Sequence, residues 1–128
     1  MRAGLSRLRR VVVKVGTSLL APPGGGVHAR RFSDLAHDVC ALLDSGREVV
    51  MVSSGAVGLG VRRLGIEGRP RSIPEKQAAA AIGQIDLCRR FERAFARRGR
   101  IIGQILLTHG GLADRELFLN ARHTLNTL

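Results

Sequence analysis

Val-Val-Val-Lys-Val-Gly-Thr-Ser, residues 11–18, is the stretch that decides the fold class. Its short β-branched run over Val11–Val15 predicts a buried strand of a parallel sheet, which ends at Gly16-Thr17-Ser18. A second such strand is predicted from Glu48 to Ser53, and it ends at Ser54-Gly55-Ala56. The carboxyl ends of parallel strands share one edge of the sheet, and ligands bind at that edge. The two glycine turns are therefore predicted to lie together and to form a cradle for a phosphate group.

Helical patterns follow both strands. After an irregular loop over residues 22–26, apolar residues recur at helical spacing from Phe32 to Leu43. Ser33 is the expected N-cap of this helix, and the helix is expected to end near Ser45-Gly46. A short helix is then predicted between the second glycine turn and about Leu64.

The second half of the chain continues the alternation. Its expected elements are a loop over 66–74 with Pro70 and Pro74 as breakers, an alanine-rich helix over 75–98 ended by Gly99, a third strand over 101–107, a Gly110-Gly111 turn and a helix over 114–128. The apolar residues assigned to the long helix are Ile82, Ile85, Cys88, Phe91 and Phe95. This order predicts an α/β fold, a three-layer α/β/α sandwich with a mostly parallel sheet, here incomplete.

Composition restricts the class of protein. The chain has 128 residues and is 45% apolar, which suffices for one folded domain, and no apolar run approaches the ~20 residues that span a bilayer. Its net charge of +11 is spread along the sequence, with no Trp or Tyr to stack on bases, so a nucleic-acid role is disfavoured. The charge is compatible with a solvated surface or with attraction of an anionic substrate such as ATP. We expect a cytoplasmic protein, because the basic N-terminal segment lacks a signal-peptide cleavage site. Cys40 and Cys88 are expected to be buried free thiols.

Lys14 and Ser54 are the residues best placed for chemistry. The Lys14 ammonium either neutralises a transferring phosphoryl group at the open end of the strand or pairs with a structural carboxylate. Ser53 and Ser54 either bind a substrate carboxylate or cap the next helix. The spacing of a Walker A loop and of a Gly-x-Ser-x-Gly elbow is absent from the sequence, which argues against a P-loop NTPase and an α/β-hydrolase.

Five motifs follow one another along the chain: the stretch at 11–18, Val-Ser-Ser-Gly-Ala-Val-Gly-Leu-Gly at 52–60, Lys-Gln-Ala-Ala-Ala-Ala-Ile-Gly-Gln at 76–84, Gly-Gln-Ile-Leu-Leu-Thr at 103–108 and Asp-Arg-Glu-Leu-Phe-Leu-Asn-Ala-Arg at 114–122. In this order they resemble the glutamate 5-kinases of the amino-acid kinase family. The glycine turns recur throughout the amino-acid kinases. The stretches at 76–84 and 114–122 best separate this branch from the aspartate, acetylglutamate, carbamate and uridylate kinases.

The resemblance implies transfer of the γ-phosphoryl group of ATP, with Mg²⁺, to the side-chain carboxylate of L-glutamate. The product is glutamyl 5-phosphate, in the first step of proline biosynthesis. By motif, the implied roles are catalysis and ATP contact for Lys14, cofactor binding for Gly16, Thr17 and Gly55, and substrate binding for Ser54, Gly55 and Ala56. Lys76 and Gln84 are expected to shape the substrate side, an oligomer contact or only the fold. The resemblance also implies a homo-oligomer in the full-length protein and no membrane partner.

The match places residues 1–128 in the N-terminal part of an amino-acid kinase domain. In the family, the later part supplies further substrate groups, a second lysine and the nucleotide-base pocket, and many members carry a C-terminal RNA-binding-like module. His109 and Gly110 depart from the family pattern, which puts the conformation of that loop in doubt. The uncapped helix at Leu128 agrees with an incomplete domain. We expect marginal stability or self-association, and little or no kinase activity, from these residues alone. The alternatives are another amino-acid kinase, or a basic nucleic-acid-binding or interaction module without catalysis.

Overall fold

The computed structural model describes residues 8–22 and 26–128 of the chain. Residues 1–7 of the basic N-terminal segment and residues 23–25 of the expected irregular loop lie outside the described residues. The elements in chain order are β1 (Arg10–Val15), α1 (Thr17–Leu20), α2 (Ala29–Asp44), β2 (Glu48–Ser53), α3 (Ala56–Leu64), α4 (Ile73–Ala96), α5 (His109–Ala113) and α6 (Arg115–Thr127). The first two predicted strands and the short helix after the second are confirmed. The four-residue helix α1 was not predicted.

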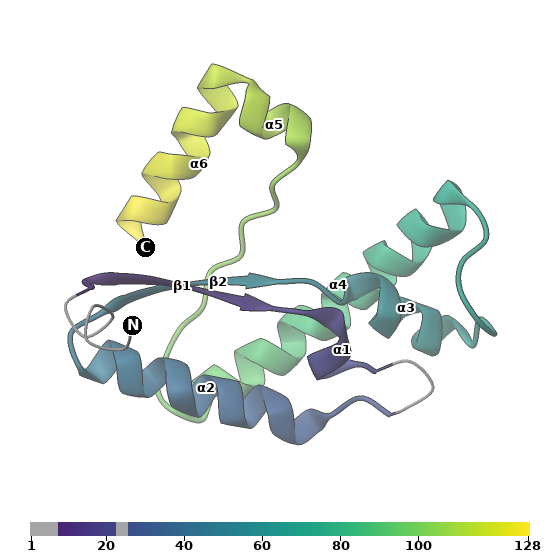
Figure 1. Ribbon diagram of the computed structural model, residues 1–128, viewed down its shortest axis with the longest axis horizontal. Coiled ribbons are helices and arrows are strands. Elements are labelled where there is room, and N and C mark those ends of the chain that lie inside the picture. The colour runs from purple at the N-terminus through teal and green to yellow at the C-terminus, as the bar shows by residue number, and fades with distance from the viewer. Residues whose placement is uncertain (1–7, 23–25) are drawn as a thin grey trace.

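The sheet consists of β1 and β2, which run parallel (Figure 1). The register pairs Arg10 with Glu48 at one end and Val15 with Ser53 at the other. Parallel strands need a crossover connection, and α2 supplies it. The helix ends where expected, with Ser45 as its C-cap and Gly46 at a φ of 81°, which an L-residue with a side chain rarely adopts.

The hydrophobic core lies on one face of this sheet. Val13 and Val15 of β1 point into it, and α2 and α4 cover it from the same side (Figure 1). Phe32 of α2 meets Phe91 of α4 edge to face, with 4.9 Å between the ring centroids. The Arg90 guanidinium adds a cation–π contact 5.9 Å from the centroid of Phe32.

The opposite face of the sheet stays largely open. Val12 and Val52 are 63% and 50% exposed. Helices α5 and α6 lie on that side of the sheet (Figure 1). The prediction that Val11–Val15 form a buried strand is therefore wrong for Val12. The order of layers is that of an α/β sandwich, and the layer formed by α5 and α6 leaves part of the sheet uncovered.

Helices α3 and α4 cross at very short range. A Cβ atom placed on Gly60 of α3 would lie 1.7 Å from the carbonyl oxygen of Ala79, and one placed on Gly83 of α4 would lie 1.7 Å from that of Ala56. Both glycines are buried, and Leu59 beside them is 2% exposed. Only glycine permits this distance between the two backbones. The crossing holds the first turn of α3 against α4.

Two helix starts differ from the predictions. Ser33 lies inside α2, which begins at Ala29 after an N-cap at His28. The His28 N–H donates to the Leu20 carbonyl at 3.0 Å. This hydrogen bond fixes the position of the N-cap, and the helix begins about one turn before Ser33. Pro74 does not break α4 but lies in its first turn, where the missing N–H of proline costs nothing.

The start of α4 is explained by a capping pattern that the sequence contains. Ser72 is the N-cap, and its hydroxyl accepts a hydrogen bond from the Glu75 N–H at 3.3 Å. The Glu75 carboxylate accepts in turn from the Arg71 N–H at 2.7 Å. A serine followed three residues later by glutamate is a known helix-start signal.

The buried stripe of α4 is also different from the expected one. Ile85 is 57% exposed, and Ile82 and Cys88 are only partly buried, whereas Phe91 and Phe95 are buried as expected. The other buried positions are Ala79, Gly83, Leu87 and Ala94. Small residues occupy the stripe at Ala79 and Gly83, because the backbone of α3 approaches too closely there for larger side chains.

The third predicted strand is absent from the described residues. Residues 101–107 have no regular secondary structure, and Ile101 is fully exposed. An apolar β-branched run becomes a strand only when a neighbouring backbone pairs with it. Here β1 and β2 pair with each other, and this segment joins neither of them.

The C-terminal hairpin is built by two side-chain caps. Thr108 Oγ1 accepts from the Gly111 N–H at 3.0 Å and starts α5, so the expected Gly110-Gly111 turn is helical instead. Asp114 Oδ1 accepts from the Leu117 N–H at 2.9 Å and starts α6, as predicted.

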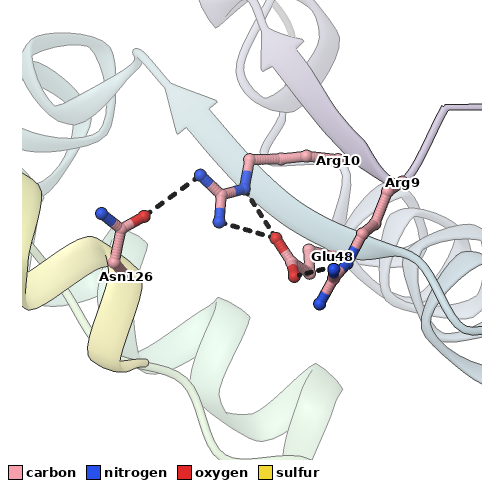
Figure 2. A network of polar contacts seen from close by, with 4 residues as sticks. All are labelled: Arg9, Arg10, Glu48 and Asn126. Atoms are coloured by element: carbon pink, nitrogen blue, oxygen red, sulfur yellow. Dashed lines mark hydrogen bonds and ion pairs between the residues drawn. The ribbon is translucent and has the colours of Figure 1, made fainter.

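A polar network joins α6 to the amino ends of the strands (Figure 2). Glu48 accepts from Arg10 Nε at 2.7 Å and lies 3.1 Å from Arg9 Nε, and Arg10 Nη1 donates to Asn126 Oδ1 at 3.1 Å. The hydrogen bond from Arg10 is the main reason why the pKa of the Glu48 carboxyl lies below its ordinary value of 4.5. This network lies at the end of the sheet opposite the glycine turns.

Both cysteines are free, and within the described residues only Cys40 is buried while Cys88 is half-buried, so the burial prediction holds for one of the two. In the part of the chain that the structure describes, no helix combines the length and the apolar character needed to cross a membrane.

Candidate active site

The two glycine turns meet at the carboxyl ends of β1 and β2, as predicted. Gly16 leads from β1 into α1, and Gly55 leads from β2 into α3, so the starts of both helices lie at the same end of the sheet (Figure 1). The Ser54 N–H donates to the Val15 carbonyl at 3.1 Å and extends the pairing of the strands into the turns. Free N–H groups at helix starts, with the positive end of the helix dipole, are suited to bind an anion.

The two glycines serve different purposes. Gly55 is buried with a φ of 121°, a backbone conformation that side chains disfavour, so the turn itself requires glycine there. Gly16 has an ordinary φ of −79°, and a Cβ atom placed on it would meet nothing within 4 Å. Neither backbone geometry nor packing among the described residues requires glycine at this position. The open space beside its backbone is where a ligand phosphate could approach.

Three oxygen atoms are joined by a short chain of hydrogen bonds between the turns. Thr17 Oγ1 donates to Ser54 Oγ at 3.2 Å, and Ser54 Oγ donates to the Val15 carbonyl at 3.3 Å. Ser53 Oγ donates to the Ser54 carbonyl at 3.2 Å. The alternative that Ser53 or Ser54 caps the next helix is wrong, because the N-cap of α3 is Gly55 and no side chain caps it.

Lys14 projects from the open face of the sheet. Its position in β1 alternates with those of Val13 and Val15, which face the core, and its side chain is exposed. In the described ranges, no carboxylate forms an ion pair with its ammonium, so the alternative of a structural ion pair finds no support. Lys14 lies two residues before Gly16, and β1 ends between them at Val15.

The structure brings together Gly16, Thr17, Ser54, Gly55 and Ala56. Among the described residues, the side chains of Lys14, Lys76 and Gln84 form no hydrogen bond with them. Lys76 is exposed in the early part of α4, and Gln84 donates from Nε2 to the Cys88 sulfur at 3.5 Å within the same helix. Neither residue forms a hydrogen bond with the two turns in the described part of the chain. The Gln84 contact favours a structural role.

Sequence reasoning missed the glycines inside the helices. Gly58 and Gly60 of α3 and Gly83 of α4 let the turn at Ser54-Gly55-Ala56 pack closely, because Gly83 lies against Ala56, the first residue of α3. The signal was present in the sequence, since glycine inside a helix is unfavourable and so indicates a packing reason.

Ligand chemistry can be compared with these groups. The helix starts and the exposed ammonium of Lys14 fit the phosphates of a nucleotide. For a metal ion the fit is poor, since the described residues contain no group of three or more His, Cys, Asp or Glu side chains that could hold one. A small hollow lined by Arg63, Ile82, Ile85, Asp86 and Arg89 lies on α3 and α4 and includes none of the site residues.

The fold is an incomplete α/β sandwich with paired glycine turns at the carboxyl ends of its parallel strands, and residues 9–128 match the amino acid kinase family. The chain therefore belongs to the amino acid kinase family.

Its relatives include several glutamate 5-kinases. The chain is 51% identical over 124 residues to the glutamate 5-kinase of Geobacter metallireducens, a match that covers 97% of this chain and 33% of the relative. It is 51% identical over 129 residues to that of Geobacter sulfurreducens, covering 100% and 35%, and 50% identical over 128 residues to that of Ralstonia nicotianae, covering 100% and 34%. The chain thus spans about a third of the length of the curated relatives it matches.

Proposed function

We propose that this protein transfers the γ-phosphoryl group of ATP to the side-chain carboxylate of L-glutamate, with Mg²⁺, and so produces glutamyl 5-phosphate for proline biosynthesis. The observation that carries the proposal is the contact of the two glycine turns through Thr17 and Ser54 at the carboxyl ends of the strands. The identity of about 50% to glutamate 5-kinases over the whole chain supports the choice of acceptor.

The reaction needs positioning and charge stabilisation more than proton transfer. A glutamate carboxylate oxygen attacks the γ-phosphorus, the bond from that phosphorus to the bridging oxygen breaks, and ADP leaves with the electron pair. The acceptor is already ionised at neutral pH, so no general base is required for this step. The protein must hold two anions close together in line.

The described residues divide this task between them. The N–H groups at the start of α1, beside the open side of Gly16, receive nucleotide phosphate oxygens, and Lys14 neutralises the charge that develops on the transferring group. The Ser54 hydroxyl and the N–H groups of Gly55 and Ala56 receive the glutamate. Mg²⁺ carried in by the nucleotide would supply neutralisation of phosphate charge, and none of the described residues is assigned to hold it.

These residues are proposed to form one side of the active site. The open sheet face at Val12 and Val52 supports a further layer of protein over the site. We therefore infer that residues 1–128 alone have little turnover. Assembly as a homo-oligomer and a cytoplasmic location remain predictions.

The experiment is a hydroxylamine trap for the acyl phosphate. Purified protein is incubated with MgATP, hydroxylamine and L-glutamate, and formation of the γ-hydroxamate is measured in the full-length protein and in residues 1–128. Aspartate, N-acetylglutamate and carbamate are tested as acceptors in parallel. No product with glutamate, or a faster reaction with another acceptor, would overturn the proposal.

A pair of variants tests the role of Lys14. Lys14→Met removes the ammonium and is expected to lower kcat about 10²–10³-fold, the usual loss for one group that stabilises the transition state. Arg31→Met removes one charge from the exposed surface of α2 and is the matched control. Equal activity of the two variants would remove Lys14 from the mechanism.

A further inference from the structure

We propose that Thr17 is a positioning residue whose hydroxyl holds Ser54 in place for the acceptor carboxylate. This inference rests on the proposed function. It assigns the side chain of Thr17 to the acceptor side of the site, whereas the sequence motif suggested a role in binding the nucleotide. Thr17 follows Gly16 in the first turn, yet its hydroxyl is directed to the second turn, 37 residues further along the chain.

The direction of the hydrogen bonds shows how Thr17 acts. Thr17 Oγ1 donates to Ser54 Oγ at 3.2 Å, which leaves the single hydroxyl hydrogen of Ser54 for another acceptor. In this structure that acceptor is the Val15 carbonyl at 3.3 Å, a long contact for two oxygen atoms. The Val15 carbonyl also accepts from the Ser54 N–H at 3.1 Å, so it keeps one partner if the hydroxyl turns away.

A substrate carboxylate is a stronger acceptor than the Val15 carbonyl. The Ser54 hydroxyl can therefore turn to an incoming carboxylate while it still accepts from Thr17. A hydroxyl that accepts one hydrogen bond becomes a better donor in the next. Thr17 thus fixes the position of Ser54 Oγ and strengthens its bond to the acceptor.

The methyl group of Thr17 has a separate task. Thr17 Cγ2 lies 3.8 Å from where a Cβ on Gly55 would stand and 3.3 Å from where a Cβ on Gly58 would stand. It fills the space that these glycines leave and packs the first turn against the start of α3. Hydroxyl and methyl can therefore be separated by two substitutions of similar size.

The test compares Thr17→Val and Thr17→Ser in the full-length protein. Valine keeps the packing and loses the hydroxyl, so the KM for glutamate should rise about fivefold to tenfold while the KM for ATP stays unchanged, as for the loss of one hydrogen bond. Serine keeps the hydroxyl and loses the methyl group, so the KM for glutamate should stay near that of the wild type while the unfolding midpoint falls.

A double substitution shows whether Thr17 acts through Ser54. In a Ser54→Ala background, Thr17→Val should cause no further rise in the KM for glutamate, because the partner of the hydroxyl is already absent. Additive effects would overturn the positioning role. So would an equal rise in both KM values for Thr17→Val, or failure of Thr17→Ser to retain the wild-type KM.

The outcomes also separate this inference from the proposed function. If the wild-type protein does not phosphorylate glutamate, both fall together. If it does, and Ser54→Ala raises the KM for glutamate while Thr17→Val does not, only the role of Thr17 is refuted.

Discussion

A single methyl group added at Gly83 should separate α3 from α4. Gly83 faces α3 from the middle of α4, and a Cβ atom built there would lie 1.7 Å from the Ala56 carbonyl oxygen and 2.4 Å from the Gly60 nitrogen. Real Cβ atoms essentially never come within 3.0 Å of such atoms. Both obstacles are backbone, so no flexible side chain can move aside, and the Gly83→Ala substitution must displace a helix.

The expected cost follows from two opposing terms. Replacing glycine by alanine inside a helix stabilises it by about 1 kcal/mol. Forcing a methyl group into a closely packed interface costs about 3 kcal/mol, and opening the interface instead exposes Leu59, which costs about 2–3 kcal/mol. Either route exceeds the gain in helix propensity. We expect Gly83→Ala to lower the free energy of unfolding by about 2 kcal/mol.

Urea unfolding followed by far-ultraviolet circular dichroism measures this difference. The matched control is Gly110→Ala in α5, another helical glycine, where a Cβ atom meets nothing within 4 Å. The control should be as stable as the wild type or slightly more stable. If Gly83→Ala behaved like Gly110→Ala, the helix crossing described here would be wrong. Because Gly83 lies against Ala56, a folded Gly83→Ala protein should also lose activity.

Three further predictions concern charge, capping and thiols. The pKa of Glu48 is lowered in the folded state, so its ion pair stabilises the fold above pH 4.5. This stabilisation disappears as the pH falls through the pKa that Glu48 has in the folded protein. The difference in unfolding midpoint between wild type and Glu48→Gln should therefore close in acid and shrink with salt, and a gap that persists at pH 2 would contradict this. Asp114→Ala should destabilise α6 by about 1 kcal/mol and speed hydrogen exchange at the Leu117 amide, while exchange in β1 stays unchanged. A uniform increase in exchange along the chain would refute the local cap. Without reductant, a thiol reagent should modify Cys88 before Cys40, and the opposite order would contradict their burial.

The sequence alone determined the elements whose signals are local. A β-branched run followed by a glycine turn specified β1 and β2, and Gly46 and Gly65 mark the ends of α2 and α3 with positive φ angles. These features depend on neighbouring residues in the chain, so a pattern of a few residues carries them. The placement of Gly16 and Gly55 at one edge also followed, because parallel strands bring their carboxyl ends together.

The tertiary structure decided which faces and partners these elements have. Residues 101–107 carry a strand pattern but pair with neither strand, and Ile85 is exposed while Gly83 is buried. The hydrogen bond from Thr17 to Ser54 joins two residues that no sequence pattern places in contact. Hydrophobic periodicity predicts that a segment buries one face. Which face is buried depends on the surface that packs against it. That selection depends on how closely two backbones approach, which in α3 and α4 is set by the missing side chains of two glycines.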